Sequence, residues 1–165
     1  MKSTGEVMGI DTDFGRAFAK AQLGAGTDLP TAGTVFISVK DEDKDAFIPI
    51  CRDLVADGFK ILATGGTTRA LNDAGVPAER INKVMEGRPH AVDAMLSGDI
   101  QLVFNTAKGA GAIRDSFSLR HTALTNKIPY YTTVSGSRAA GQAIRAIQQG
   151  NVGVRTLQGF LSDVS

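Results

Sequence analysis

The sequence predicts an α/β fold in which a mostly parallel, five-stranded sheet lies between two layers of helices. Three observations predict it. Short apolar runs typical of strands alternate with segments whose apolar residues recur every three or four positions. Short turns join these segments, and glycines follow most of the helical ones. Strands that alternate regularly with helices form parallel sheets covered on both faces.

The beginning of the chain differs from the rest. The apolar spacing predicts a helix over 12–23. Its apolar face is expected to hold Phe14, Ala17, Phe18 and Ala21. Residues 25–33 are mostly small and polar, which is typical of a linker. We therefore predict a separate segment over 1–24, a linker over 25–33 and a main domain over 34–165.

Strands and helices alternate through the main domain. The expected strands are 34–39, 59–63, 80–84, 101–105 and 130–134, with a further edge strand at 152–157. The expected helices are 43–57, 67–74, 90–97, 113–126 and 137–149. Because proline is tolerated only near a first turn, Pro49 predicts that the regular helix at 43–57 begins later than Asp43.

Composition argues against several functions. The net charge of +1, with both signs mixed, provides no basic field for nucleic acid. No apolar run approaches the roughly 20 residues of a membrane span, and the first residues lack a signal-peptide pattern, so we expect a cytoplasmic protein. Cys51 lies in an apolar stripe and is expected to be buried. No histidine or cysteine pairing has metal-ligand spacing, so we expect no metal site.

The turn at 63–68 is where a phosphate fits best. It reads Ala-Thr-Gly-Gly-Thr-Thr and follows an apolar strand. Two glycines allow a close backbone approach, threonine hydroxyls donate hydrogen bonds, and the N-terminus of the next helix favours an anion. An ordinary strand-to-helix turn has the same pattern, so this motif alone leaves both interpretations open.

Polar residues also follow the other strands. Because ligands bind beyond the carboxyl ends of parallel strands, we expect these residues to form one rim suited to a small anion with sugar-like hydroxyls. The rim comprises Lys40, Lys44, Thr64, Gly65, Gly66, Thr67, Thr68, Lys83, Val84, the loop 85–90, Asn105, Thr106, residues 107–109, Thr132 and Thr133.

Several charged residues have structural explanations as well. Lys44 is also explained as a solvated charge at a helix start. A solvated charge explains Lys83 less well, because this residue lies inside a predicted strand of a buried sheet. We expect His90 at a helix N-terminus and His121 in a structural role within its helix.

Specific strings of residues resemble one known family. Lys83–His90 (KVMEGRPH), with the turn at Ala63–Thr67 before it and Leu102–Thr106 after it, resembles the C-terminal allosteric domain of the carbamoyl-phosphate synthetase large subunit. That domain has the methylglyoxal-synthase-like fold. Met1–Gly9 and Phe18–Gly24 resemble the end of the preceding synthetase unit, so we interpret 1–24 as its tail.

The resemblance implies a non-catalytic, regulatory domain. The parent would be an ATP-dependent, glutamine-hydrolysing ligase that makes carbamoyl phosphate for pyrimidine and arginine biosynthesis. Its domain binds a nucleotide, the inhibitor uridine monophosphate (UMP) or the activator inosine monophosphate (IMP). The implied effector contacts are Ser38, Lys44, Thr64, Gly65, Gly66, Thr67, Lys83, Val84, Asn105 and Thr106. Ala107 stands where the family has a threonine, and Thr106 or Lys108 would have to compensate for the lost hydroxyl.

The resemblance also implies partners. They are the remainder of the large subunit, the glutaminase small subunit and, as a further candidate, a second copy of the chain. This chain would need no cofactor of its own, because ATP and a divalent metal would bind upstream units. Tyr130 and Thr132 match this domain's contribution to an ornithine site whose acidic residues lie in the upstream unit, so the chain is not expected to bind ornithine well by itself.

Two other functions share parts of this pattern. A phosphate-eliminating lyase of the methylglyoxal-synthase type needs a carboxylate base after a Gly-Gly turn. Here Glu86 is the nearby carboxylate and is not in the matching place. The cyclising domain of purine biosynthesis has a similar glycine turn but lacks the Glu-Gly-Arg-Pro-His string.

Overall fold

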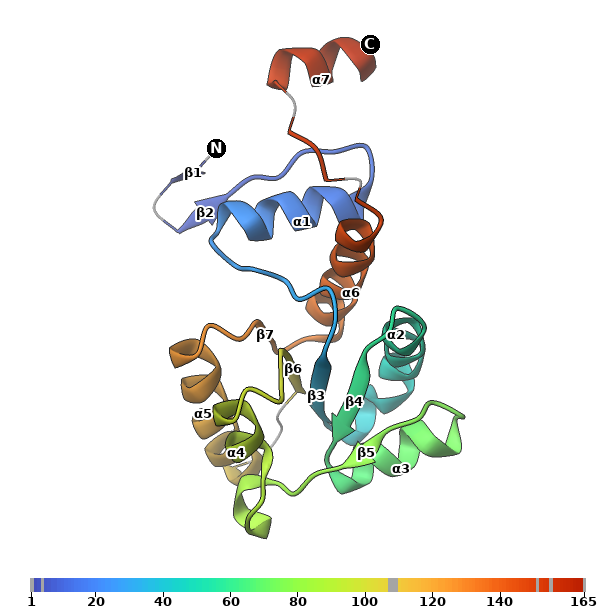
Figure 1. The fold of residues 1–165 in the computed structure, drawn as a ribbon, viewed down its shortest axis with the longest axis vertical. Coiled ribbons are helices and arrows are strands. Elements are labelled where there is room, and N and C mark those ends of the chain that lie inside the picture. Colours follow the sequence, from blue (N-terminus) through green and yellow to red (C-terminus); the bar gives the residue numbers. More distant parts are fainter. Residues whose placement is uncertain (1, 4, 107–109, 151, 155, 165) are drawn as a thin grey trace.

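The computed structural model describes residues 2–3, 5–106, 110–150, 152–154 and 156–164. A five-stranded sheet forms its centre, in the order β5-β4-β3-β6-β7 with every neighbouring pair parallel (Figure 1). The strands are β3 (Thr34–Val39), β4 (Lys60–Ala63), β5 (Glu79–Arg80), β6 (Leu102–Thr106) and β7 (Tyr130–Tyr131). A separate antiparallel pair joins β1 (Lys2–Ser3) to β2 (Glu6–Val7).

Helices cover both faces of the sheet, as the sequence predicts. The helices are α1 (Phe14–Gly24), α2 (Lys44–Ala56), α3 (Gly65–Asp73), α4 (Ala91–Leu96), α5 (Ala110–Thr125), α6 (Val134–Gln148) and α7 (Leu157–Val164). Two 3₁₀ turns, η1 (Asp41–Asp43) and η2 (Val84–Glu86), follow β3 and β5. Helices α2, α3 and α6 share one apolar core with the sheet, and α4 and α5 share the other. The predicted three-layer arrangement is confirmed, and the described sheet is wholly parallel.

The central strands contribute to both cores because side chains alternate along a strand. In β3, Val35 and Ile37 pack into the core beside α2, whereas Phe36 packs into the core beside α4 and α5. In β6, Phe104 faces the first core and Val103 the second. All five side chains are at most 1% exposed. Burial on both faces explains why these strands are continuous apolar runs in the sequence.

Helix α2 begins later than Asp43, as Pro49 predicts, but it still runs through this proline. It begins at Lys44, one residue after the boundary taken from the apolar pattern, and Pro49 lies in its second turn. A proline inside a helix costs about 3 kcal/mol. Phe47 and Leu54 are completely buried, and each large apolar side chain contributes roughly 1.5–3 kcal/mol. Packing of the helix on the sheet therefore offsets the cost of the proline.

Two strand predictions are wrong or too long. The described part of 152–157 contains no strand, and the chain enters α7 at Leu157. Leu157, Phe160 and Leu161 recur at helical rather than alternating spacing, which explains the helix. The strand predicted at 130–134 ends at Tyr131, because the Thr133 hydroxyl accepts a hydrogen bond from the Gly136 amide at 3.0 Å and caps α6.

Helix α1 packs against α6 rather than against the sheet (Figure 1). A Cβ on Gly15 would lie 2.8 Å from the Gln142 carbonyl oxygen, so the two backbones meet closely there. The predicted apolar face is only partly right: Phe18 packs on the larger core, but Phe14 is 60% exposed. The division of the chain at 24 and 33 stays a prediction.

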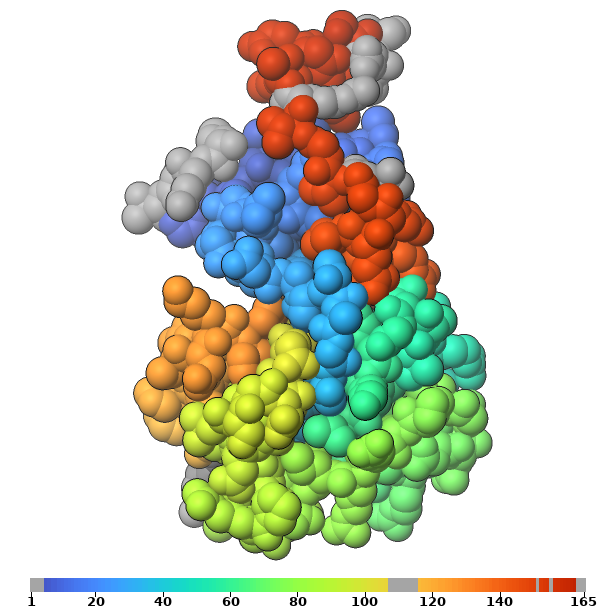
Figure 2. Space-filling view, in the orientation of Figure 1, coloured from blue at the N-terminus to red at the C-terminus, as the bar shows by residue number. Residues whose placement is uncertain are grey.

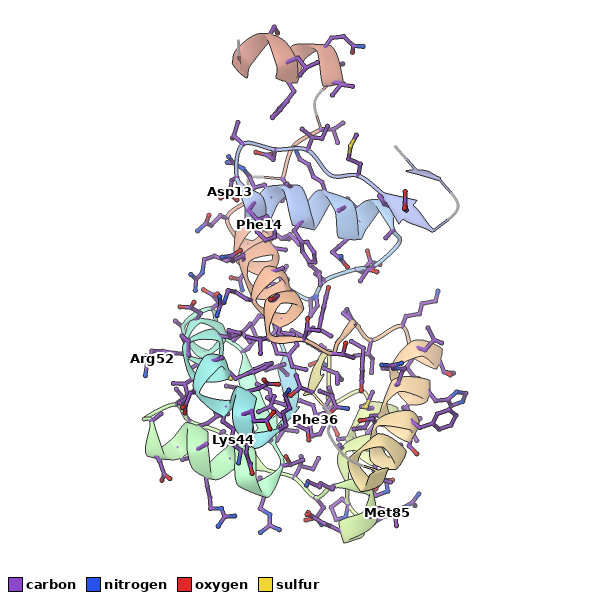
Figure 3. All side chains as sticks on the ribbon, turned by 180° about the vertical axis from the view of Figure 1, so that it is seen from behind. Asp13, Phe14, Phe36, Lys44, Arg52 and Met85 are labelled. Carbon is purple, nitrogen blue, oxygen red and sulfur yellow. The ribbon has the colours of Figure 1, made fainter. Side chains whose placement is uncertain are left out.

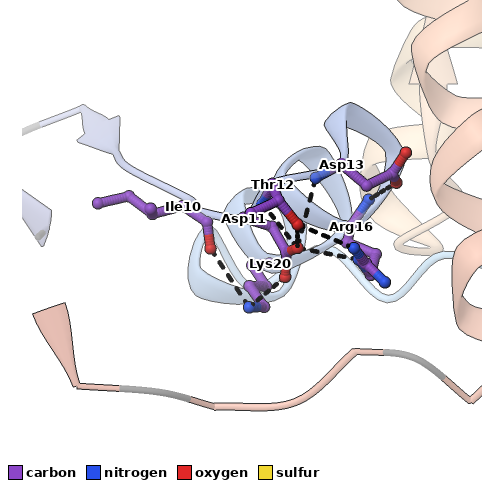
Figure 4. A network of polar contacts seen from close by, with 6 residues as sticks. All are labelled: Ile10, Asp11, Thr12, Asp13, Arg16 and Lys20. Carbon is purple, nitrogen blue, oxygen red and sulfur yellow. Dashed lines mark hydrogen bonds and ion pairs between the residues drawn. The ribbon is translucent and has the colours of Figure 1, made fainter. Parts of the chain in front are cut away.

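A polar network holds the start of α1. The Asp11 carboxylate accepts hydrogen bonds from the Arg16 guanidinium at 2.9 Å and the Lys20 ammonium at 2.7 Å (Figure 4). These contacts hold the pKa of Asp11 well below its usual range, with the hydrogen bond from Lys20 as the largest cause. The network therefore links the segment before α1 to the first two turns of the helix.

The sequence also made predictions about Cys51, His90 and His121. Cys51 is completely buried, as predicted. His90 caps α4, as predicted, because its Nδ1 accepts from the Asp93 amide at 3.3 Å. His121 is exposed on α5, where its ring stacks on Phe117 with centroids 6.4 Å apart, so its apolar neighbours in sequence do not bury it. No helix within the described residues is long and apolar enough to span a membrane.

Candidate functional site

The carboxyl ends of the strands surround a cavity of about 330 Å³. A cavity of this size falls in the range of small-ligand sites. It is lined by Phe36, Ser38, Val39, Lys40, Asp41, Glu42, Thr64, Lys83, Val84, Ala91, Asn105, Thr106, Ser116 and Leu119. Six of the ten predicted effector contacts are among these residues: Ser38, Thr64, Lys83, Val84, Asn105 and Thr106. The structure therefore brings together residues from four separate strand-to-helix connections.

Hydroxyl groups tie the ends of β3, β4 and β6 to one another. The Thr64 hydroxyl lies 3.3 Å from the Ser38 hydroxyl and 3.4 Å from the Thr67 hydroxyl. The Lys40 amide donates to the Thr106 hydroxyl at 3.1 Å. Thr64, Thr67 and Thr106 are at most 6% exposed, and the first and last of them line the polar side of the cavity.

The glycine turn is the first turn of α3. The helix begins at Gly65, two residues earlier than predicted, so the backbone amides of both glycines belong to its N-terminus. A Cβ on Gly66 would lie 3.1 Å from the Lys44 ammonium nitrogen. Gly65, Gly66 and Thr67 do not line the cavity, although Thr64 directly before them does. Helix amides, a glycine and a lysine at one place are suited to an anion.

Lys83 lies in a different structural element from the predicted one. Strand β5 ends at Arg80, and Lys83 is an exposed residue at the start of η2. Its backbone amide donates to the Glu86 carboxylate at 3.1 Å instead of to a neighbouring strand. The prediction that Lys83 lies inside a buried strand is therefore wrong, because a local hydrogen bond forms a turn there. Lys83 and Val84 nevertheless line the cavity.

Asn105 is held from two sides. Its side-chain nitrogen donates to the Ser116 hydroxyl of α5 at 2.8 Å and to the Tyr130 hydroxyl of β7 at 2.6 Å. Asn105 is 5% exposed, so these bonds fix the orientation of its amide. Sequence reasoning identified Asn105 but not Ser116, because the position of α5 relative to β6 is not visible in a local pattern.

The other side of the cavity is apolar. Phe36, Ala91 and Leu119 line it, and all three also belong to the smaller core. In the view of Figure 3, Phe36 lies between Lys44 at the start of α2 and Met85 in η2. Sequence reasoning missed this surface, although the alternation in β3 places Phe36 on the face opposite Val35 and Ile37. The cavity thus combines a polar side with an apolar side.

Two lysines near the polar side, Lys40 and Lys44, are paired with carboxylates of η1. The Lys44 ammonium lies 2.6 Å from Asp41, and the Lys40 ammonium lies 3.4 Å from Glu42. The hydrogen bond from Lys44 keeps the pKa of Asp41 below its usual range. Glu86, the carboxylate considered for a lyase, does not line the cavity. The described residues contain no group of three acidic, histidine or cysteine side chains that would hold a metal.

Tyr130 and Thr132 line a second hollow, of about 500 Å³. Figure 2 shows the surface hollowed between the N-terminal segment and α5. Gln22, Arg120 and Lys127 also line this hollow, and no carboxylate does within the described part of the chain. Tyr130 is therefore connected to both sites. Its hydroxyl accepts a hydrogen bond from Asn105 at the first cavity, and the residue also lines the second hollow. Ala107 and Lys108 lie outside the described residues.

Comparison with known proteins identifies similar chains. A family model described as "MGS-like domain" matches residues 46–132. The carbamoyl phosphate synthase large chain of Rhizobium meliloti is 56% identical over 160 residues, which are 97% of this chain and 14% of that protein. The large chain of Nostoc sp. is 50% identical, with the same coverage. This chain therefore spans 14% of the length of these curated relatives.

Two solved structures share the fold. Methylglyoxal synthase from Elizabethkingia anophelis superposes with a TM-score of 0.52 at 18% identity, over 66% of this chain and 76% of that one. ForH superposes with the same score and identity, over 74% of this chain and 83% of that one. Likeness at this identity concerns the fold alone, because one fold hosts many functions.

Proposed function

Because this chain belongs to the MGS-like domain family, we propose that it is the regulatory domain of a carbamoyl phosphate synthase large chain and that its cavity binds a nucleoside monophosphate. The observation that carries the proposal is the convergence of donors from four strand-to-helix connections on one cavity with an apolar side. The proposed ligands are UMP, as an inhibitor of carbamoyl phosphate synthesis, and IMP, as an activator.

The two sides of the cavity suit the two ends of such a ligand. The phosphate would contact the hydroxyls of Ser38 and Thr64, with the N-terminus of α3 and Lys44 close by. Lys83 would add a second cation from η2. The base would lie against Phe36 and Leu119. A hydrogen bond that involves a charged group contributes roughly 1.5–3 kcal/mol before the cost of ordering the ligand and the side chains.

Regulation would work through a difference between two states of the larger enzyme. A ligand shifts an equilibrium only by its differential affinity for the two states. The domain would transmit the signal through its contact with the rest of the large chain. We propose that the hollow beside Tyr130 and Thr132 is only half of an ornithine site, because Arg120 and Lys127 line it and would repel the cationic amines of ornithine.

Isothermal titration calorimetry of this chain with UMP, IMP and uridine tests the proposal. We expect heat of binding with at least one nucleotide and much weaker binding of uridine, which lacks the phosphate. Turnover of dihydroxyacetone phosphate is measured in parallel. Turnover without nucleotide binding would favour the lyase function and overturn the proposal.

The substitution Lys83→Ala tests the position of the phosphate. We expect it to weaken nucleotide binding by at least about 1 kcal/mol, the lower part of the range for a charged contact. Lys60→Ala is the matched control, because Lys60 is also exposed but lies at the start of β4, away from the cavity. Equal affinities of the two variants would show that the phosphate binds elsewhere.

A further inference from the structure

The lysine over the glycine turn is already paired with a carboxylate. The Lys44 ammonium lies 2.6 Å from an Asp41 carboxylate oxygen. The same ammonium lies 3.1 Å from the position that a Cβ on Gly66 would occupy, at the first turn of α3. Lys44 therefore stands at the helix N-terminus where the proposed phosphate would bind, and its charge is engaged by Asp41.

The Asp41 carboxylate lies at the cavity itself. Asp41 and Lys83 both line it, and the Asp41 side chain is 92% exposed. The pKa of Asp41 is lowered chiefly by the hydrogen bond from Lys44, and the charge of Lys83 adds to the effect. The carboxylate is thus within the field of both lysines that the proposed function assigns to the phosphate.

The other carboxylates of η1 have different contacts. Oxygens of Glu42 and Asp43 lie 3.4 Å and 3.6 Å from the Lys40 ammonium. The contact with Lys44 therefore distinguishes Asp41 from its neighbours in the same turn. Since Asp41 is exposed, its removal uncovers no buried group, and a variant should keep the fold.

We propose that Asp41 is a built-in competitor of the ligand's phosphate, a carboxylate that must release Lys44 before a phosphate engages it. This inference rests on the proposed function and adds a control of affinity to the same site. A phosphate monoester carries about −1.5 to −2 charges at pH 7, whereas a carboxylate carries one, so the ligand displaces Asp41. The carboxylate lowers the affinity and favours ligands with a doubly charged phosphate.

The test compares wild-type protein with Asp41→Asn, which keeps the size of the side chain and removes its charge. Calorimetry with UMP, with IMP and with inorganic phosphate gives the affinities. We expect Asp41→Asn to bind all three about three- to tenfold more tightly, since it removes both an exposed ion pair and a like charge. Uridine should bind the two proteins equally, because it has no phosphate to compete.

Asp45→Asn is the matched control. It removes the same charge from the first turn of α2, but Asp45 does not line the cavity. We expect its affinity for UMP to stay within about twofold of wild type, because exposed charges at a distance are screened. An equal gain in this variant would mean that net charge, not Asp41, sets the affinity, and would overturn the inference.

The remaining outcomes separate the inference from the proposed function. If the wild type binds a nucleotide and Asp41→Asn binds it equally or more weakly, then Asp41 positions Lys44 instead of competing, and only this inference fails. If neither protein binds UMP, IMP or phosphate, the proposed function fails and the inference fails with it.

Discussion

The two faces of the sheet differ in the size of their apolar cores and in how many core residues line the cavity. The face covered by α2, α3 and α6 carries the larger core, in which Phe47, Leu54 and Phe104 are completely buried. The face covered by α4 and α5 carries a smaller core, and three residues of that core also line the cavity. The smaller core thus contributes three residues to this cavity and the larger core contributes one, Val39, while a separate hollow of about 260 Å³ is lined by residues of α2 and α6.

The difference follows from which side chains the helices present. On the larger face, α2 supplies long apolar residues that fill the space above the strands. On the smaller face, α4 begins with Ala91, and α5 presents Ser116 toward Asn105. Small and polar residues at the carboxyl edge leave room there.

The largest expected effect concerns the larger face. Leu54→Ala should lower the free energy of unfolding by about 2–5 kcal/mol, because it truncates a completely buried side chain of the larger core. Urea unfolding followed by circular dichroism measures the loss. Nucleotide affinity of the folded variant should be unchanged. A loss below about 1 kcal/mol, or a change in affinity, would break the division between the two faces.

A second prediction uses pH to probe the same face. Burial raises the pKa of Cys51 from 9.0 to about 12. The folded state therefore keeps this proton while the unfolded state loses it, so stability is complete below pH 9 and falls as pH rises toward 12. One proton corresponds to a slope of about 1.4 kcal/mol per pH unit. Urea unfolding of the wild type at pH 8, 9, 10 and 10.5 measures this slope.

Cys51→Ala is the control for the pH effect. This variant should lose the part of the slope that begins at pH 9. It should keep a fall above pH 10, because burial also raises the pKa of Tyr131 from 10.0 to about 12. Identical slopes in both proteins would show that the thiol does not titrate on unfolding.

The smallest expected effect compares adjacent tyrosines that point to opposite faces. Tyr130→Phe removes the hydroxyl that holds Asn105 at the cavity, so nucleotide binding should weaken by about 0.5–1.5 kcal/mol. Tyr131→Phe is the matched control, because its hydroxyl contacts Gln22 at 3.1 Å on the larger face. Calorimetry should find a change in the first variant only. Equal affinities would mean that Ser116 alone orients Asn105.

Much of the fold could be predicted because the signals are local. Alternation of apolar runs with helical spacing placed β3 at its observed bounds and the other strands of the sheet within a few residues. Glycine and proline positions marked most helix ends. Two of the failures occurred where a side chain bonded its own backbone region. Glu86 turned 83–86 away from the sheet, and Thr133 began α6 early.

The site was only partly predictable. The rule for parallel sheets identified polar residues such as Thr64 and Asn105 because they directly follow strands. Ser116 and Leu119 were missed, because nothing in the spacing of α5 shows which of its residues meet β6. The pairing of Lys44 with Asp41 was missed as well, since a lysine three residues after an aspartate at a helix start is usually a solvated charge.

The sequence by itself determined the alternation of strands and helices over 34–149 and the family resemblance, because these depend on neighbours within a few residues. Only the tertiary structure decided that Lys83 and Asn105 border the same cavity, with Phe36 on its apolar side. The proximity of these residues depends on the strand order β5-β4-β3-β6-β7. This order places β4 and β5 on one side of β3 and β6 on the other. Strand order results from packing between segments distant in the chain, and no local pattern encodes it.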